Sequence, residues 1–329
     1  MTSMQYRLFD GVPVGEVGLG CWQLGGDWGS VDDATARGIL RAAHEAGTTF
    51  FDTADVYGAG RSETLIGQWL REDRPEGVFV ATKQGRFSPP GWPENFTLET
   101  MRAQVDASRR RLGVEALDLV QLHCIPTEVL RAGEVFDHLR TLRSEGRIVR
   151  FGASVESMEE ALLCLEQEGL VSLQILFNLF RPKPAEVLFP EARRRGVALI
   201  VRLPLASGLL AGTFGPGTVF AETDHRRYNR DGAAFHVGET FAGVPYESAL
   251  ELVEELRPLV PQGWSMAEMA QRWVLDFPEV AVSIPGASRP AQAIANARTS
   301  ALPRLHPDLH ERLAAFAVGR AEPLVRGRY

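Results

Sequence analysis

Short apolar runs alternate with longer amphipathic stretches from one end of the chain to the other. The runs are rich in β-branched and aromatic residues, a composition typical of buried strands. They predict strands at residues 49–51, 78–81, 117–122, 148–152, 173–177, 198–201 and 280–284.

The stretches between these runs carry helix signals. Ser30, Ser157 and Ser265 each precede an acidic residue three positions later, a pairing that satisfies free backbone donors at a helix start. The first is the weakest signal, because Asp33 stands where Glu is preferred. A proline and several glycines mark the expected ends of these and two further helices: Gly47, Gly113, Gly146, Gly169 and Pro278.

This strand and helix alternation predicts parallel strands joined by right-handed crossovers, with the helices outside. A closed (β/α)8 TIM barrel accounts for the number of units better than an open sheet does. No GxGxxG follows an early strand, which argues against a Rossmann fold. Since no linker interrupts the pattern, we expect residues 1–329 to form a single domain.

One connection is long for a barrel, the loop 203–245 after the seventh strand. Loops of this length are often lids or mobile surface. Its basic segment 225–230 would suit a phosphate contact, but a solvated charged loop is the favoured interpretation.

Four chemically active side chains follow or end three of the predicted strands. Asp52 and Tyr57 come after the first of these strands, Lys83 after the next, and His123 after the third. Parallel α/β folds place their chemistry at the carboxyl ends of the strands. The four side chains are therefore expected to meet.

These groups suit proton transfer to a carbonyl oxygen. The pKa of a free tyrosine is about 10, and a nearby ammonium such as that of Lys83 lowers it. Asp52 would supply the countercharge of the lysine, and a neutral His123 would hold the carbonyl in line. None of the four can deliver a hydride, so a reductant must come from a cofactor.

The chain resembles the aldo-keto reductases over nearly its whole length. The run 52–67, with Tyr57, Glu63 and Gly67 in place, is similar to a signature of that family. Lys83 and His123 fall where the family has its lysine and histidine. The likeness continues through the segments 149–154, 204–210 and 283–289.

The resemblance implies an extended nicotinamide dinucleotide across the barrel mouth. Ser154 and Gln174 would hold the carboxamide. The ring would be bordered by Gly20 and Trp22, which follow the first strand. The residues implied along the pyrophosphate are Leu205, Ser207 and Leu210, and those around the adenosine end are Ser288, Arg289, Gln292 and Asn296.

Three positions depart from the family pattern. Val155 replaces a frequent Asn, and Arg202 replaces an aromatic residue that stacks on the nicotinamide, although a planar guanidinium can also stack. Gly286 replaces a frequent Lys, which leaves Arg289 as the chief candidate for a 2′-phosphate. We therefore expect NADP(H) as the preferred cofactor, with NAD(H) as the alternative.

Trp22 and Trp92 are candidates for the walls of an apolar substrate pocket over the reactive carbonyl. Loop packing is an equally good interpretation for Trp92. The substrate is expected to be a small carbonyl compound, and nothing in the sequence identifies it or the oligomeric state.

Composition narrows the remaining classes. A net charge of -7 argues against a general nucleic-acid binder. The 3 scattered cysteines are typical of reduced thiols, and no segment has the length and apolarity of a membrane span. These features indicate a cytoplasmic enzyme that binds neither nucleic acid nor membrane.

The leading hypothesis is thus NADP(H)-dependent reduction of an aldehyde or ketone, with Tyr57 as proton donor. One alternative is a nucleotide-sensing module, similar to the channel-associated members of the same superfamily. A metal-dependent barrel enzyme with Asp52, Asp55 and His123 as ligands is a third hypothesis, which leaves Tyr57 and Lys83 without a role.

Overall fold

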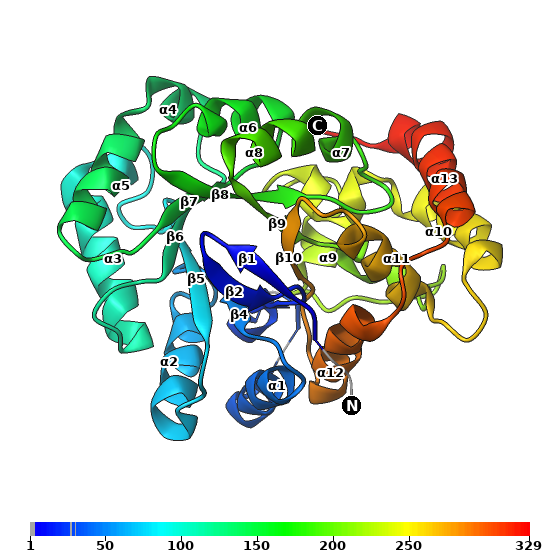
Figure 1. The fold of residues 1–329 in the computed structure, drawn as a ribbon, viewed down its shortest axis with the longest axis horizontal. Helices are drawn as coiled ribbons and strands as arrows, with labels where there is room; N and C mark the ends of the chain where they lie inside the picture. The colour runs from blue at the N-terminus through cyan, green and yellow to red at the C-terminus, as the bar shows by residue number, and fades with distance from the viewer. Residues whose placement is uncertain (1–3, 27, 30) are drawn as a thin grey trace.

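Eight parallel strands form a nearly closed barrel in the computed structural model, which describes residues 4–26, 28–29 and 31–329. The strands pair in sequence order (Figure 1). They are β3 (Leu19–Gly20), β4 (Phe50–Asp52), β5 (Phe79–Gln84), β6 (Leu119–His123), β7 (Phe151–Ser154), β8 (Leu170–Leu176), β9 (Ala198–Arg202) and β10 (Val280–Ile284). The backbone N–H of Gly18 donates to Ser283 O at 2.8 Å, which joins the last strand to the first. The predicted (β/α)8 barrel is confirmed.

The helices are α1 (Asp33–Glu45), α2 (Arg61–Asp73), α3 (Leu98–Leu112), α4 (Thr127–Ala132), α5 (Glu134–Ser144), α6 (Met158–Leu165), α7 (Pro184–Val187), α8 (Phe189–Arg195), α9 (His225–Tyr228), α10 (Tyr246–Leu256), α11 (Met266–Leu275), α12 (Pro290–Arg298) and α13 (Pro307–Phe316). Most helices lie outside the barrel and connect successive strands, whereas α12 and α13 follow the last strand and α9 belongs to the long loop 203–245 (Figure 1).

The predicted helix caps are formed to different degrees. At α11, Ser265 and Glu268 make the full reciprocal capping box. At α6, Ser157 accepts from the backbone of Glu160, but the Glu160 carboxylate takes the N–H of Glu156 instead of that of Ser157. At α1 the cap is Asp32; the predicted Ser30 lies outside the described residues.

An N-terminal hairpin that the sequence did not predict closes one end of the barrel. Its strands are β1 (Tyr6–Phe9) and β2 (Val12–Gly15). Phe9 is fully buried against Phe50 and Phe79, with ring centroids 5.4 and 5.2 Å away. The hairpin lies across the barrel in Figure 1, so the chemistry belongs to the opposite end.

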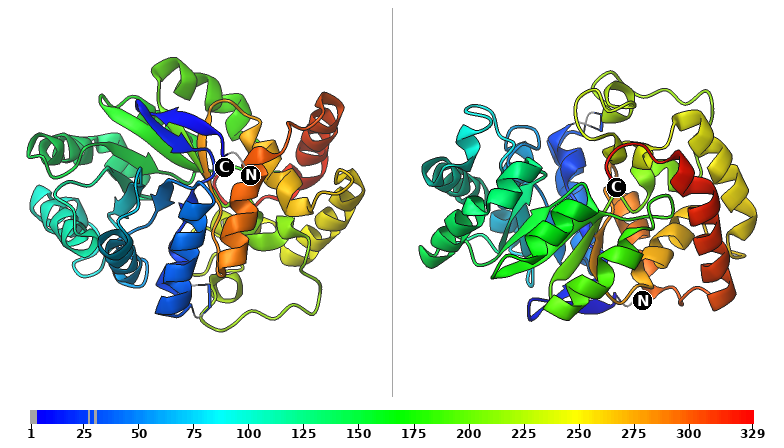
Figure 2. Two further views of the ribbon diagram at one scale, coloured as in Figure 1. Left: turned by 60° about the horizontal axis from the view of Figure 1, so that its bottom comes forward. Right: turned by 90° about the horizontal axis from the view of Figure 1, so that it is seen from above.

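The long loop 203–245 covers that opposite end (Figure 2, right). Its basic segment is only partly a solvated loop, because Arg227 and Tyr228 are exposed but its other members are not. His225 and Asn229 are fully buried, and Asn229 Oδ1 accepts the N–H groups of Ala234 and Phe235, each at 2.9 Å. The guanidinium of Arg226 lies 4.8 Å from the ring of Trp28. Packing and hydrogen bonds order the loop over the barrel.

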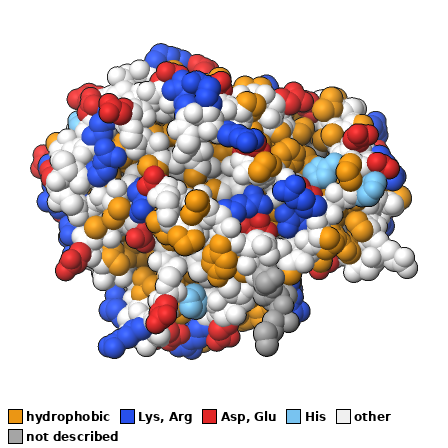
Figure 3. All heavy atoms as spheres, viewed as in Figure 1, with side chains coloured by type: hydrophobic (Ala, Val, Ile, Leu, Met, Phe, Trp, Pro, Cys, Tyr) orange, Lys and Arg blue, Asp and Glu red, His pale blue; other side chains and the backbone are white. Residues whose placement is uncertain are grey.

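Charged side chains of both signs are interspersed on the face that carries the hairpin (Figure 3). Many are paired, as Arg150 is with Asp10 at 2.7 Å. Within the described part of the chain, no helix has the length and apolarity needed to cross a membrane.

Candidate active site

The structure brings the four predicted catalytic side chains together at the carboxyl ends of β4, β5 and β6. Lys83 Nζ donates to Asp52 Oδ1, to the backbone oxygen of Thr53 at 2.9 Å, and to the Tyr57 hydroxyl at 3.2 Å. The His123 ring lies edge-on to the Tyr57 ring, with centroids 5.8 Å apart. The phenol therefore lies beside both the ammonium and the imidazole.

Asp52 is fixed by more partners than the sequence indicated. Its second oxygen, Oδ2, accepts from Gln174 Nε2 at 2.7 Å and from Gln121 Nε2 at 3.2 Å. The role of Gln121 was missed, because a buried glutamine inside a strand has no distinctive sequence pattern. A carboxylate engaged by an ammonium and two amides is poorly available to a metal ion, so the metal-site hypothesis for Asp52, Asp55 and His123 finds no support.

Burial dominates the proton affinities in the site. It raises the pKa of Tyr57 to about 12, and the neighbouring Lys83 offsets only part of that rise. Lys83 therefore acts in the predicted direction, but the pKa of the phenol is raised on balance, not lowered. Burial alone would lower the pKa of Lys83, but attraction to Asp52 and Tyr57 raises it above its usual value. For His123, burial and then the charge of Arg86 lower the pKa well below its usual value, so the imidazole is neutral, as expected.

A cavity of about 360 Å³ opens beside Tyr57 and His123 and extends to the start of α12. Trp22 forms one wall and stacks on Tyr57, with centroids 5.9 Å apart and an interplanar angle of 18°. All predicted cofactor residues except Leu210 and Arg289 line this cavity: Gly20, Trp22, Ser154, Gln174, Arg202, Leu205, Ser207, Gly286, Ser288, Gln292 and Asn296. The two exceptions differ in kind: Leu210 is fully buried and Arg289 is exposed.

The end of the cavity at α12 presents polar groups. Arg289 is the residue before the helix and makes no side-chain cap, and Pro290 follows it. The Gln292 side chain accepts from the backbone N–H and hydroxyl of Ser288, at 2.9 and 3.0 Å. A helix start of this kind presents backbone donors to an anion.

Trp92 does not reach the cavity. Its side chain is half exposed, and its indole N–H donates to the backbone oxygen of Gly85. The ring packs on Phe96, with centroids 6.2 Å apart. The structure thus supports loop packing for Trp92, and its prediction as a substrate wall is corrected.

A charge cluster that the sequence did not predict borders the catalytic groups. It consists of Arg86, Glu156, Arg202 and Glu239, with the Cys124 thiol at its centre, and its members follow or end β5, β6, β7 and β9. Glu156 Oε1 lies 2.9 Å from Arg86, and Glu239 Oε1 lies 3.4 Å from Arg202 and 3.9 Å from Arg86. The cluster ties the long loop, which carries Glu239, to the barrel.

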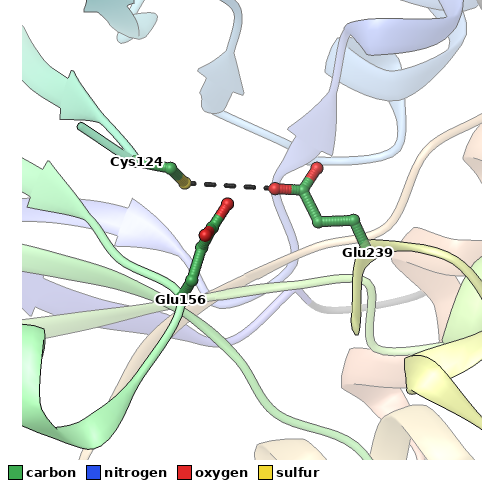
Figure 4. Close-up of side chains that lie close together, drawn as sticks. All are labelled: Cys124, Glu156 and Glu239. Atoms are coloured by element: carbon green, nitrogen blue, oxygen red, sulfur yellow. Dashed lines mark hydrogen bonds between the residues drawn. The ribbon is translucent and has the colours of Figure 1, made fainter. Parts of the chain in front are cut away.

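Cys124, Glu156 and Glu239 converge closely enough to suggest a metal site (Figure 4). Their candidate ligand atoms all lie within 4.8 Å of one another. However, burial raises the pKa of the Cys124 thiol to about 11, so the thiol stays protonated, and the two guanidiniums already pair with the carboxylates. We interpret the group as an ion-pair network.

Asp55 makes the stability depend on pH. Neither of its buried carboxylate oxygens has a hydrogen-bond partner among the described residues, and burial, followed by Glu63, raises its pKa to about 8. The unfolded chain loses this proton near its ordinary pKa of about 4, whereas the folded protein retains it. The stability that the protonated Asp55 carboxyl contributes is therefore fully present below about pH 4 and is lost as the pH rises through about 8.

We expect Asp55→Asn to be more stable than the unchanged protein above this window, by about 2–4 kcal/mol. Urea unfolding at the acidic end of this window and above it measures the difference, with the exposed Asp137 changed to Asn as the control. Equal pH dependence in Asp55→Asn and the unchanged protein would contradict this assignment.

Known proteins are similar to this chain in sequence and in fold. The chain is 29% identical over 291 residues to the aldo-keto reductase YhdN of Bacillus subtilis, covering 86% of this chain and 84% of that protein. It is 27% identical over 302 residues to the NADH-specific methylglyoxal reductase of Escherichia coli, covering 87% and 89% of the two chains. The holo structure of aldo-keto reductase AKR11C1 from Bacillus halodurans superposes with a TM-score of 0.79 at 25% identity, covering 99% and 98%.

The family model described as "Aldo/keto reductase family" matches residues 16–317. This range contains the four catalytic candidates and every residue assigned to the cofactor. The match, the barrel and the relatives agree with the resemblance found in the motifs, and the chain belongs to the aldo/keto reductase family.

Proposed function

We propose that the protein reduces an aldehyde or ketone to an alcohol, taking a hydride from NADPH and the proton from Tyr57. The observation that carries this proposal is that Tyr57, His123 and most of the residues assigned to the cofactor line the same cavity. The membership of an oxidoreductase family supports carbonyl reduction in general.

Each catalytic side chain has a role that its contacts support. Tyr57 gives its proton to the carbonyl oxygen while charge develops there, which overcomes the high pKa of the resting phenol. Lys83, 3.2 Å behind the hydroxyl, stabilises the phenolate that remains. Asp52 keeps the ammonium in place, and the neutral His123 holds the carbonyl in line.

The residues present fit a nicotinamide dinucleotide. Arg202 Nε is buried at the cavity and has no hydrogen-bond partner in the described structure, so a donor is left for a ligand. Ser154 and Gln174 would hold the carboxamide; the hydrogen bonds of Gln174 to Asp52 use only its amide nitrogen, which leaves its carbonyl oxygen to accept. The bound cofactor supplies the hydride, and Trp22 borders its ring.

The preference for NADP(H) rests on Arg289, which is exposed at the start of α12 and can grip a phosphate with two parallel hydrogen bonds. The Escherichia coli relative is named NADH-specific, so NAD(H) remains the competing cofactor. Arg289→Gln should weaken NADPH binding more than NADH binding if Arg289 contacts the 2′-phosphate.

The test is a fluorescence titration with NADPH and NADH, followed by turnover of the preferred form with a panel of aldehydes and ketones. We expect tighter binding of NADPH and oxidation that depends on the carbonyl compound. Binding of neither form would overturn the proposal. Tight binding without turnover of any carbonyl compound would favour the nucleotide-sensing alternative.

A further inference from the structure

Arg202 ends β9 and lines the cavity, at a position where the resemblance implies that an aromatic residue is frequent. Its side chain is 10% exposed. One terminal nitrogen donates to the backbone oxygen of Val155 at 3.1 Å, and the other lies 3.4 Å from Glu239 Oε1. The guanidinium is therefore held in one orientation before any ligand arrives.

The charges around Arg202 are partly balanced. Glu239 is ionised: burial opposes its charge, but Arg202 and Arg86 outweigh that effect and lower its pKa. Glu156, paired with Arg86, stands further along the cluster. Of the catalytic groups that line the cavity, His123 is neutral, and the charge of Asp52 is balanced by that of Lys83. Arg226 also lines the cavity, but it is paired with Asp224 outside it. Among the described residues, Arg202 and Glu239 are thus the ion pair with both members on the cavity wall.

A charge at this place acts differently on the two forms of the cofactor. The ring of an oxidised nicotinamide is a cation, whereas the ring of a reduced nicotinamide is neutral. A buried positive charge repels a cation strongly because little water screens it, and it leaves a neutral ring almost unaffected.

We propose that Arg202 and Glu239 set the relative affinity of this protein for oxidised and reduced cofactor, Arg202 against the oxidised form and Glu239 in its favour. This inference rests on the proposed function, since it takes the nicotinamide ring to lie beside Arg202. Arg202 would thus stand in place of a stacking aromatic residue and would also discriminate electrostatically between the oxidised and the reduced cofactor.

The proposal predicts opposite effects from the two ends of one ion pair. Arg202→Gln removes the positive charge and should lower the ratio Kd(NADP⁺)/Kd(NADPH) about tenfold, or about 1.4 kcal/mol. Glu239→Gln leaves the guanidinium uncompensated and should raise the ratio by a similar factor. A purely structural role would instead weaken both cofactor forms together in both variants, because each breaks the same contact.

The experiment measures both dissociation constants by calorimetry at one alkaline pH, where Glu156 is ionised. Arg202→Lys keeps the charge and should keep the ratio near that of the unchanged protein. Arg289→Gln serves as the matched arginine control: it should weaken both redox forms equally, because the adenosine end is the same in both. If Arg202→Gln fails to fold, Glu239→Gln and Arg202→Lys still decide the question.

Ratios that agree within twofold in the unchanged protein, Arg202→Gln and Glu239→Gln would overturn the inference. If Arg202→Gln does not fold, a ratio for Glu239→Gln within twofold of that of the unchanged protein would overturn the inference. A protein that binds neither NADP⁺ nor NADPH would instead overturn the proposed function, so the two failures are distinguishable.

Discussion

Replacing Tyr57 by Phe is expected to lower kcat by about 10²–10⁴-fold while the affinity for NADPH changes little. The substitution removes the proton donor but keeps the ring that stacks on Trp22 at 5.9 Å. Lys83 does not take over, because its ammonium lies behind the hydroxyl and is held by Asp52 and the Thr53 oxygen.

Steady-state oxidation of NADPH with the best aldehyde measures this effect, and fluorescence titration measures the cofactor affinity. Tyr246→Phe is a control: Tyr246 is buried and donates to the Gly215 oxygen at 3.1 Å, outside the cavity. Its kcat should stay close to that of the unchanged protein. A kcat for Tyr57→Phe within a few-fold of normal would remove Tyr57 as the proton donor.

Replacing Lys83 by Met is expected to lower the free energy of unfolding by about 3–5 kcal/mol. Both partners of the Lys83–Asp52 pair are almost fully buried, so the change leaves a carboxylate in a site with little water. The amides of Gln121 and Gln174 stay on Asp52 and soften the loss without neutralising the charge.

The double variant Asp52→Asn with Lys83→Met should recover part of this stability, because it removes the unpaired charge. Denaturant unfolding near neutral pH compares the three proteins. Arg41→Met breaks the exposed pair with Asp73 and should have a much smaller effect. A double variant less stable than Lys83→Met would show that the loss does not come from the uncompensated carboxylate.

The barrel was predictable because its signals are local. Most of the strands are short apolar runs, and several helices begin at a side-chain cap or end at a glycine, so the order of elements can be followed along the chain. The catalytic four were predictable for a related reason: parallel strands place their carboxyl ends at one rim, which brings Asp52, Lys83 and His123 together whatever their separation in sequence.

The features that were missed depend on contacts between distant segments. Glu239 is an ordinary glutamate in a polar loop until the loop folds back onto Arg202 and Arg86. The N-terminal hairpin is too short to have a clear periodicity. Its role in closing the barrel can be recognised only in the folded structure, where Phe9 is buried at the end of the barrel.

Burial also explains the errors. Lys83 lowers the pKa of Tyr57 as predicted, but the desolvation that outweighs it depends on the complete surroundings of the ring. Trp92 was a plausible wall by its place after β5, yet its indole turns to Gly85. Neither outcome can be deduced from spacing along the chain.

The most direct test of the proposed chemistry follows the hydrogen itself. The enzyme is supplied with the best aldehyde and with NADPH that carries deuterium at both hydrogen positions of the reactive carbon of its nicotinamide ring, and the alcohol is analysed by mass spectrometry and NMR. We predict one deuterium on the carbinol carbon and none from deuterated solvent at that carbon. An alcohol that carries no deuterium from the cofactor would contradict hydride transfer and, with it, the role given to Tyr57.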